Sequence, residues 1–379
     1  MTFESFTPAA LSCFGSAFNR TPAIDSIAAK GWVASRLVAE NVDPRLVLRS
    51  WWSQPWWEGR DVTFITDDPM LADAPEVDPH AQVHWIENAA TSIATTWEDT
   101  HLARLASLAA ASLTQMDGAD EASSSGVVWL HSRFLSQAWD APRSLFPVEE
   151  LAWEDESEAL YDDEGKPIEA QHTDAWTAPL PALFNDVEPP HLNLGINEHP
   201  DFAITWMRTY ATQVRLIDLV IETLTLASPS SRVLLAGTSG MALGTNRHIG
   251  PAAGPLRSCH LHLPLILALN LQQRSGHLLG SGQVATWLNA LLSGQVPAAA
   301  TAAAWAQPYD SAAPVITHDQ HGVPVAVSTH DWFYGVNDNR LFVKPDDIHD
   351  VNDVARLRPD VVEQLLIQCD LNPGGVTES

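Results

Sequence analysis

The sequence predicts a mixed α+β protein. Three observations support this: apolar residues recur at helical spacing through the first 117 residues, 127–200 alternates like strands with many prolines, and 201–379 mixes long apolar helical stretches with a β-meander. We therefore expect a mainly helical region at 1–117, an extended hairpin- and loop-rich region at 127–200 and a mixed region at 201–379, packed as one compact unit.

The first region predicts two helices before its first strand. "PAIDSIAAKGWVASRLVAE" (22–40) begins at a proline, has an acid in its first turn and repeats apolar residues at helical spacing, and "DPRLVLRSWW" (43–52) predicts a second, shorter helix. A strand is expected at 61–66, followed by a long helix at 85–113. "GADEASSSG" (118–126) is expected to be a flexible connection.

The middle and last regions are expected to differ. In the middle, "GVVWLHSRFL" and 148–176 indicate strands joined by turns, with a hairpin tip at 163–165, and the proline-rich stretch 177–200 should be an ordered loop. In the last region we expect a central helix at 201–227, a buried strand in "SRVLLAGTSG", helices at 261–275 and 282–294, a meander at 318–345 and a terminal helix at 353–369.

Composition excludes several classes of protein. Hydrophobic residues make up 45% of the 379 residues, which is typical of a globular chain, and the longest apolar run, at 261–271, is too short to cross a bilayer. The net charge of −27 argues against direct nucleic-acid binding. The N-terminus lacks a basic start, and the three cysteines are far apart, so we expect an intracellular protein that is not secreted.

Tryptophan is unusually frequent, with fifteen residues against three lysines. A cluster of four, Trp51, Trp52, Trp56 and Trp57, is predicted to lie at a contact with another protein subunit, because indoles are enriched at such interfaces. Two alternatives stay open: the rings belong to the chain's own core, or they form a platform for carbohydrate. The acidic run 148–165 is expected to be a solvated face.

One set of residues resembles an iron site. His172-x-Asp174 has the spacing with which non-haem iron oxygenases hold Fe(II), His330 could be the third ligand, and Arg340 stands where an arginine could bind 2-oxoglutarate. The predicted helices between the first and last ligands do not suit the double-stranded β-helix of such enzymes. "EGKPIEAQHTDAW" also resembles "HGVPVAVSTHDWF", so we interpret both as the ends of hairpin strands and expect no metal and no cofactor.

A second histidine group, at 247–263, resembles the metal-binding stretch of aspartyl/asparaginyl β-hydroxylases. That resemblance would make His248 a ligand and Arg257 the co-substrate binder. His260 and His262 cannot both face one metal from a helix, so histidines hydrogen-bonded in a turn and a core are the favoured interpretation. The common nucleotide-binding, zinc-protease and serine-hydrolase motifs are absent from the sequence.

The stretch "NRLFVKPDDIHDVN" (339–352) resembles the clamp proteins of turreted double-stranded RNA viruses, which cement the inner capsid shell. The resemblance implies a non-enzymatic structural protein, located in the virion or the host cytoplasm, with an inner shell protein among its partners and no membrane contact. The alternative is an Fe(II)/2-oxoglutarate oxygenase that uses His172, Asp174 and His330. The sequence gives neither the identity of the partner, the oligomeric state nor a substrate.

Overall fold

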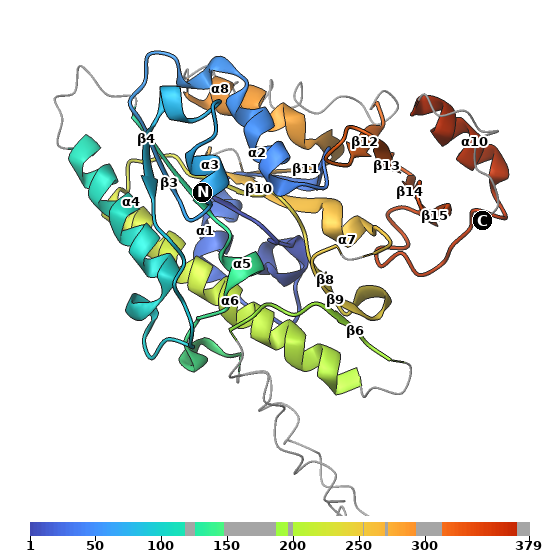
Figure 1. The fold of residues 1–379 in the computed structure, drawn as a ribbon, viewed down its shortest axis with the longest axis horizontal. Helices are drawn as coiled ribbons and strands as arrows, with labels where there is room; N and C mark the ends of the chain where they lie inside the picture. The colour runs from blue at the N-terminus through green and yellow to red at the C-terminus, as the bar shows by residue number, and fades with distance from the viewer. Residues whose placement is uncertain are drawn as a thin grey trace, which may run out of the picture.

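The computed structural model describes residues 1–117, 126–147, 187–195, 200–252, 254–269, 272–292 and 313–369. Its centre is an eight-stranded sheet in the order β11-β2-β10-β7-β1-β5-β3-β4 (Figure 1). The strands are β1 (Thr2–Phe3), β2 (Trp32–Val38), β3 (Val62–Thr66), β4 (Gln82–Trp85), β5 (Val127–Ser132), β7 (Leu234–Gly237), β10 (His262–Leu267) and β11 (Gln273–Gly280). Within this sheet β10 runs antiparallel to both of its neighbours, and the other pairs are parallel.

Helices cover both faces of the sheet, so the strands are buried on two sides. One face packs against α1 (Pro22–Lys30), α4 (His101–Asp117) and the long α6 (Pro200–Ala227), and the other against α2 (Pro44–Trp52) and α8 (Val284–Leu292). Successive strand residues alternate between the two cores, as Phe64 and Ile65 do on β3.

A smaller antiparallel sheet lies beside the large one (Figure 1). It contains β12 (Val315–His318), β13 (Pro324–Ser328), β14 (Trp332–Gly335) and β15 (Arg340–Val343), and α10 (Pro359–Gln368) packs on it. Hydrogen bonds connect it to the segment after β2, among them Thr317 Oγ1 to Ala39 O at 2.7 Å. Three short strands, β6 (Leu192–Asn193), β8 (Ala242–Leu243) and β9 (His248–Gly250), form a third sheet, and α3 (Pro69–Ala72), α5 (Phe134–Gln137) and α7 (Ser258–Leu261) are short helices.

The mixed α+β class predicted from the sequence is confirmed at the coarse level of a protein with both helices and sheets, and so are several elements. The strand predicted at 61–66 is β3, and the helices predicted at 43–52, 201–227 and 282–294 are α2, α6 and α8. The meander expected at 318–345 is the smaller sheet, and α10 lies inside the predicted terminal helix. The division of the chain into three regions stays a prediction.

One predicted helix is too long and another is wrong, because central strands of a sheet covered on both faces form continuous apolar runs. The helix expected over 22–40 ends at Lys30, and β2 follows Gly31. A Cβ atom at Gly31 would lie 2.3 Å from the carbonyl oxygen of Leu267, so this close approach of two chain segments requires glycine. The helix expected over 261–275 is replaced by β10 and β11.

The long helix predicted at 85–113 is only half right. Trp85 ends β4, and α4 begins at His101, whose backbone N–H donates to Oδ2 of Asp140 at 2.7 Å. A carboxylate from a distant segment therefore caps this helix, which local periodicity could not reveal. The connection predicted at 118–126 lies almost wholly outside the described residues, as do the hairpin at 163–165 and most of the loop at 177–200.

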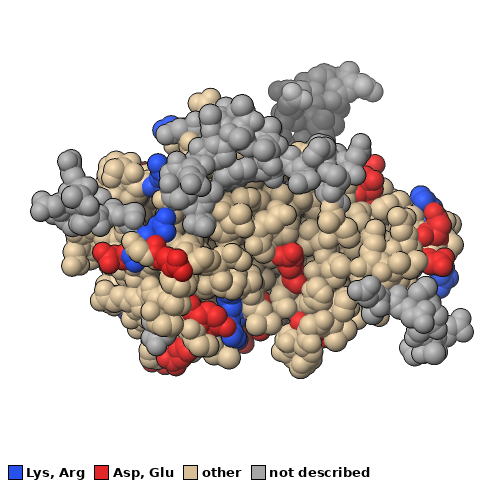
Figure 2. Space-filling model, turned by 90° about the horizontal axis from the view of Figure 1, so that it is seen from above, with Lys and Arg blue, Asp and Glu red and all other residues tan. Residues whose placement is uncertain are grey.

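The exposed charges are dispersed on the face that Figure 2 shows. Lys and Arg lie there in small groups beside Asp and Glu, rather than in a continuous basic patch. Among the described helices, none is both long and apolar enough to cross a membrane.

Candidate functional site

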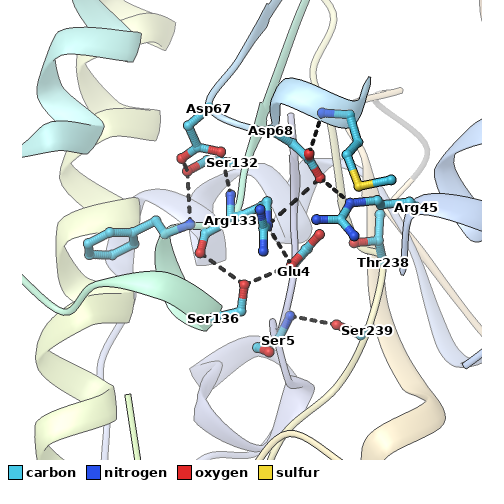
Figure 3. Close-up of polar contacts among 12 residues, drawn as sticks. Glu4, Ser5, Arg45, Asp67, Asp68, Ser132, Arg133, Ser136, Thr238 and Ser239 are labelled. Atoms are coloured by element: carbon cyan, nitrogen blue, oxygen red, sulfur yellow. Dashed lines mark hydrogen bonds and ion pairs between the residues drawn. The ribbon is translucent and has the colours of Figure 1, made fainter. Parts of the chain in front are cut away.

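Polar side chains gather where β1, β3, β5 and β7 end (Figure 3). These four strands run in the same direction. In the chain β1 is followed by α1 and β2, but in the sheet its neighbours are β7 and β5. In open α/β sheets, ligands bind outside the carboxyl ends of the strands where successive connections go to opposite sides. The end of β1 is such a position.

Glu4 follows β1 and is 5% exposed. Its Oε2 accepts a hydrogen bond of 2.7 Å from the hydroxyl of Ser136 and lies 3.4 Å from Nε of Arg133. Burial raises the pKa of Glu4 from its ordinary value of 4.5 to about 7, and the charge of Arg133 opposes this rise only in part. At neutral pH this carboxyl group can therefore both take up and release a proton.

Asp68 follows β3 and is fully buried. Its Oδ1 accepts from the backbone N–H of Met70 at 2.9 Å, capping α3, and its Oδ2 accepts from Nε of Arg45 at 2.6 Å. Arg45 comes from the first turn of α2, and its side chain is 26% exposed. The guanidinium group thus binds a buried carboxylate on one edge and reaches solvent with the rest.

Arg133 is held from several sides. Its backbone N–H donates to Oδ1 of Asp67 at 2.8 Å, and Oδ2 of Asp67 accepts from the Ser132 hydroxyl at 2.6 Å. With its amide oxygen turned toward Arg133, Gln137 accepts from both terminal nitrogens at 2.8 and 3.0 Å. Nε lies 3.8 Å from Asp68 Oδ2 and 3.4 Å from Glu4 Oε2, which are charge contacts rather than hydrogen bonds.

The backbone after Glu4 has an unusual conformation. Ser5 has φ +54°, in the left-handed region that side chains rarely adopt. Ser239, after β7, accepts from its N–H at 2.8 Å, and the Tyr210 hydroxyl donates to its carbonyl oxygen at 2.7 Å. Such strain persists where the surroundings fix it, and it is concentrated at functional sites.

Three residues of this site could hold a metal ion. One ligand atom from each of Glu4, Asp68 and His131 lies within 4.8 Å of the other two, and all three residues are buried. His131 Nδ1 lies 3.0 Å from Thr2 Oγ1, whereas its Nε2 has no hydrogen-bond partner among the described residues. Burial lowers the pKa of His131 to about 4, so the imidazole is neutral, as a metal ligand must be.

Comparison with solved structures identifies the architecture. The phosphonate monoester hydrolase of Agrobacterium radiobacter matches with a TM-score of 0.63 at 11% identity, over 97% of this chain and 94% of its own. A 2-O GAG sulfatase matches with a TM-score of 0.62 at 11% identity, over 97% and 90%. The chain has a sulfatase-like fold. A third match, solved in complex with its substrate D-glucosamine-2-N,6-O-disulfate, has a TM-score of 0.61 at 13% identity and covers 100% and 99%. No protein-family model and no curated protein sequence matches the chain.

These neighbours correct the functional predictions made from the sequence. Both the clamp protein of a viral capsid and the Fe(II)/2-oxoglutarate oxygenase are wrong, because the whole chain matches sulfatases and a phosphonate hydrolase. The predicted capsid partners are wrong for the same reason. The stretch 339–352 covers β15 and the turn after it, within the smaller sheet and its flank, and its resemblance to clamp proteins was local.

The tryptophans predicted at a subunit contact lie in the chain's own core. Trp51, Trp52 and Trp56 are at most 1% exposed, and the Trp52 ring lies 5.1 Å from that of Trp129 on β5. Trp57 is partly buried and stacks on His80 at 3.5 Å. This placement agrees with the alternative that the rings belong to the chain's own core.

The predicted iron ligands are not brought together within the described residues. His172 and Asp174 lie outside those residues, and His330 lies in the turn between β13 and β14, where its Nδ1 is 2.5 Å from Asp331 Oδ1. Arg340 is half exposed and lies 3.7 Å from Asp338.

In the other group, both ring nitrogens of His248 are bonded, to Asn193 and Pro251, and Arg257 pairs with Asp338 at 2.8 Å. His262 bonds the carbonyl oxygen of Ser35. Both histidines are therefore hydrogen-bonded within the fold, as the first residues of β9 and β10.

Sequence reasoning missed the site itself, although a signal was present. Two of its strands, at 61–66 and in "GVVWLHSRFL", were predicted, and each ends in polar residues: Asp67 and Asp68 after the first, and His131 and Arg133 in the second. Because the two strands are parallel neighbours, their carboxyl ends meet at one edge of the sheet, and the polar residues there indicate a site.

Proposed function

We propose that this protein is a hydrolase of anionic esters, of the phosphate, phosphonate or sulfate class, with its reaction centre at the carboxyl end of β1. The observation that carries the proposal is the hydrogen bond of 2.7 Å from the Ser136 hydroxyl to Glu4 Oε2, a carboxylate whose pKa burial raises to about 7. A hydroxyl that donates to a neighbouring base is the core of an activated nucleophile, and the charge of Arg133 lies 3.4 Å from this base.

In the proposed reaction, Glu4 takes the proton of Ser136 as Oγ attacks the phosphorus or sulfur atom. The ester bond breaks, and the proton on Glu4 passes to the leaving alcohol oxygen. A water molecule gives a proton to Glu4 and attacks the phosphorus or sulfur atom, the bond from that atom to Ser136 Oγ breaks, and the proton on Glu4 passes to Oγ, so that both residues return to their starting states. Arg45 and Arg133 stabilise the negative charge of the transferred group, since guanidinium forks suit such oxygens.

The choice of substrate class rests on the two arginines and on the fold. The solved structures with a similar fold include a phosphonate monoester hydrolase and a 2-O GAG sulfatase, which supports anionic esters as the substrate class. Overall the chain is strongly acidic, and the arginines therefore supply local positive charge against a repelling background. We propose that the reaction requires no cofactor, because base, nucleophile and cations are side chains.

A second candidate is binding without turnover. It is favoured by the closed charge network: Arg45 already binds Asp68 at 2.6 Å, and Arg133 lies near both Glu4 and Asp68. A site whose charges are paired internally could hold an ester without cleaving it.

Turnover measurements separate the two candidates. Purified protein would be incubated with p-nitrophenyl sulfate, p-nitrophenyl phosphate and p-nitrophenyl phenylphosphonate, and nitrophenolate release followed against buffer. Calorimetry with the corresponding non-hydrolysable sulfonates and phosphonates would report binding. Release from at least one ester supports the hydrolase, and binding with no release supports the second candidate. The absence of both release and binding would contradict both candidates.

A further inference from the structure

Arg133 lies beside Glu4 and Asp68 (Figure 3), two of the three residues that could bind a cation; the third is His131. Arg133 Nε is 3.4 Å from Glu4 Oε2 and 3.8 Å from Asp68 Oδ2, so it faces two of the three potential ligands. Nε itself has no hydrogen-bond partner among the described residues. It therefore contributes charge at this point rather than a directed bond.

The third potential ligand gives independent support for a cation position. His131 is fully buried, and its Nδ1 contacts the hydroxyl of Thr2, which leaves Nε2 as the unbonded ring nitrogen. A histidine that ligates a metal usually has its other nitrogen fixed in this way. An imidazole nitrogen with two carboxylate oxygens is a donor set for Zn²⁺ or Mn²⁺.

We infer that this is a latent divalent-cation site in which the guanidinium of Arg133 takes the place of the metal. The charges balance, because the arginines 45 and 133 face the carboxylates of Glu4 and Asp68. A divalent ion bound by Glu4 and Asp68 would lie close to the fixed positive charge of Arg133, which would repel it. The inference concerns binding alone and stands whether or not the protein turns over an ester.

The test is to remove the charge and measure metal binding. Wild type, Arg133→Met and Arg133→Lys would be freed of metal with a chelator, dialysed, and titrated with Mn²⁺ and Zn²⁺ in a calorimeter. Arg133→Met should bind one equivalent of at least one of these ions, on the order of a hundredfold more tightly than wild type. Arg133→Lys, which keeps the charge, should behave like wild type.

Two further variants control the result. Arg133→Met combined with His131→Ala should lose the gained site, and Arg20→Met, at an exposed position, should leave metal binding unchanged. Thermal melting of each variant verifies that it is folded. The inference is overturned if wild type binds the ion as tightly as Arg133→Met, if folded Arg133→Met gains no site, or if the gained site survives loss of His131.

Discussion

The Ser136 hydroxyl donates a hydrogen bond of 2.7 Å to Oε2 of Glu4, which lies buried at the end of β1. Ser136 belongs to α5 and is half-buried, whereas Glu4 is separated from it by 132 positions in the chain. The parallel pairing of β1 with β5 brings the two together. The proposed chemistry depends on this pair.

The first prediction concerns the pH dependence of hydrolysis. Because a general base must be ionised, and the pKa of Glu4 is raised to about 7, kcat/KM should rise as the pH increases through about 7 and then level off. Glu4→Gln should lose roughly 10²- to 10⁴-fold in kcat and this pH step, while still binding a non-hydrolysable analogue. An unchanged pH profile in Glu4→Gln would exclude Glu4 as the base.

The second prediction concerns stability. Since the carboxyl of Glu4 holds its proton to higher pH in the folded state than in the unfolded state, the folded state binds more protons between about pH 4.5 and 7. The contribution of Glu4 to the free energy of unfolding should therefore fall as pH rises across that window, by roughly 3 kcal/mol.

Urea unfolding of wild type and Glu4→Gln at pH 4.5 and 7.5 measures this effect. Burial lowers the pKa of His131 to about 4, which makes stability rise with pH, but this contribution is common to both proteins and cancels in the difference. Equal pH dependence in the two proteins would contradict the raised pKa of Glu4.

The third prediction concerns substrate binding by Arg45. Arg45→Ala should raise KM about tenfold or more, because a charged hydrogen bond to the ester is lost. Arg49, one turn further along α2, pairs with Glu76 instead, so Arg49→Ala is a matched control that should leave KM unchanged. If both variants have the same KM as wild type, Arg45 does not contact the substrate.

The fourth prediction concerns the tryptophan cluster. Trp52→Ala should lower the free energy of unfolding by about 3–5 kcal/mol, because the ring packs against Trp56, Phe64 and Trp129. Trp85, which is 49% exposed, provides the control, and its replacement by Ala should have little effect. Normal melting of Trp52→Ala would show that the ring is not part of the core.

The sequence predicts elements better than it predicts their arrangement. α6 is recognisable because its apolar period continues over 28 residues, and α2 because Asp43 and Pro44 mark its start. β10 and β2 were mistaken for helices, since a strand covered on both faces has no alternation to distinguish it. Helix or strand was decided there by contacts with distant segments, which local periodicity does not contain.

The site was harder to predict for the same reason. Glu4, Asp68 and Arg133 lie far apart in the chain, carry no spacing motif, and meet only because β1 inserts between β5 and β7. By contrast, the spacing of His172 and Asp174 matches a short motif with a known chemistry. The intracellular location expected from the N-terminus stays a prediction.

The central claim is that Ser136 is the nucleophile of an ester hydrolase, and one measurement tests it most directly: steady-state kcat of wild type and Ser136→Ala on the p-nitrophenyl ester that wild type cleaves fastest, at pH 8. The account predicts that wild type turns over and that Ser136→Ala, with an unchanged melting temperature, falls at least about a thousandfold. No turnover by wild type on any of the esters, or a wild-type rate in Ser136→Ala, would contradict it.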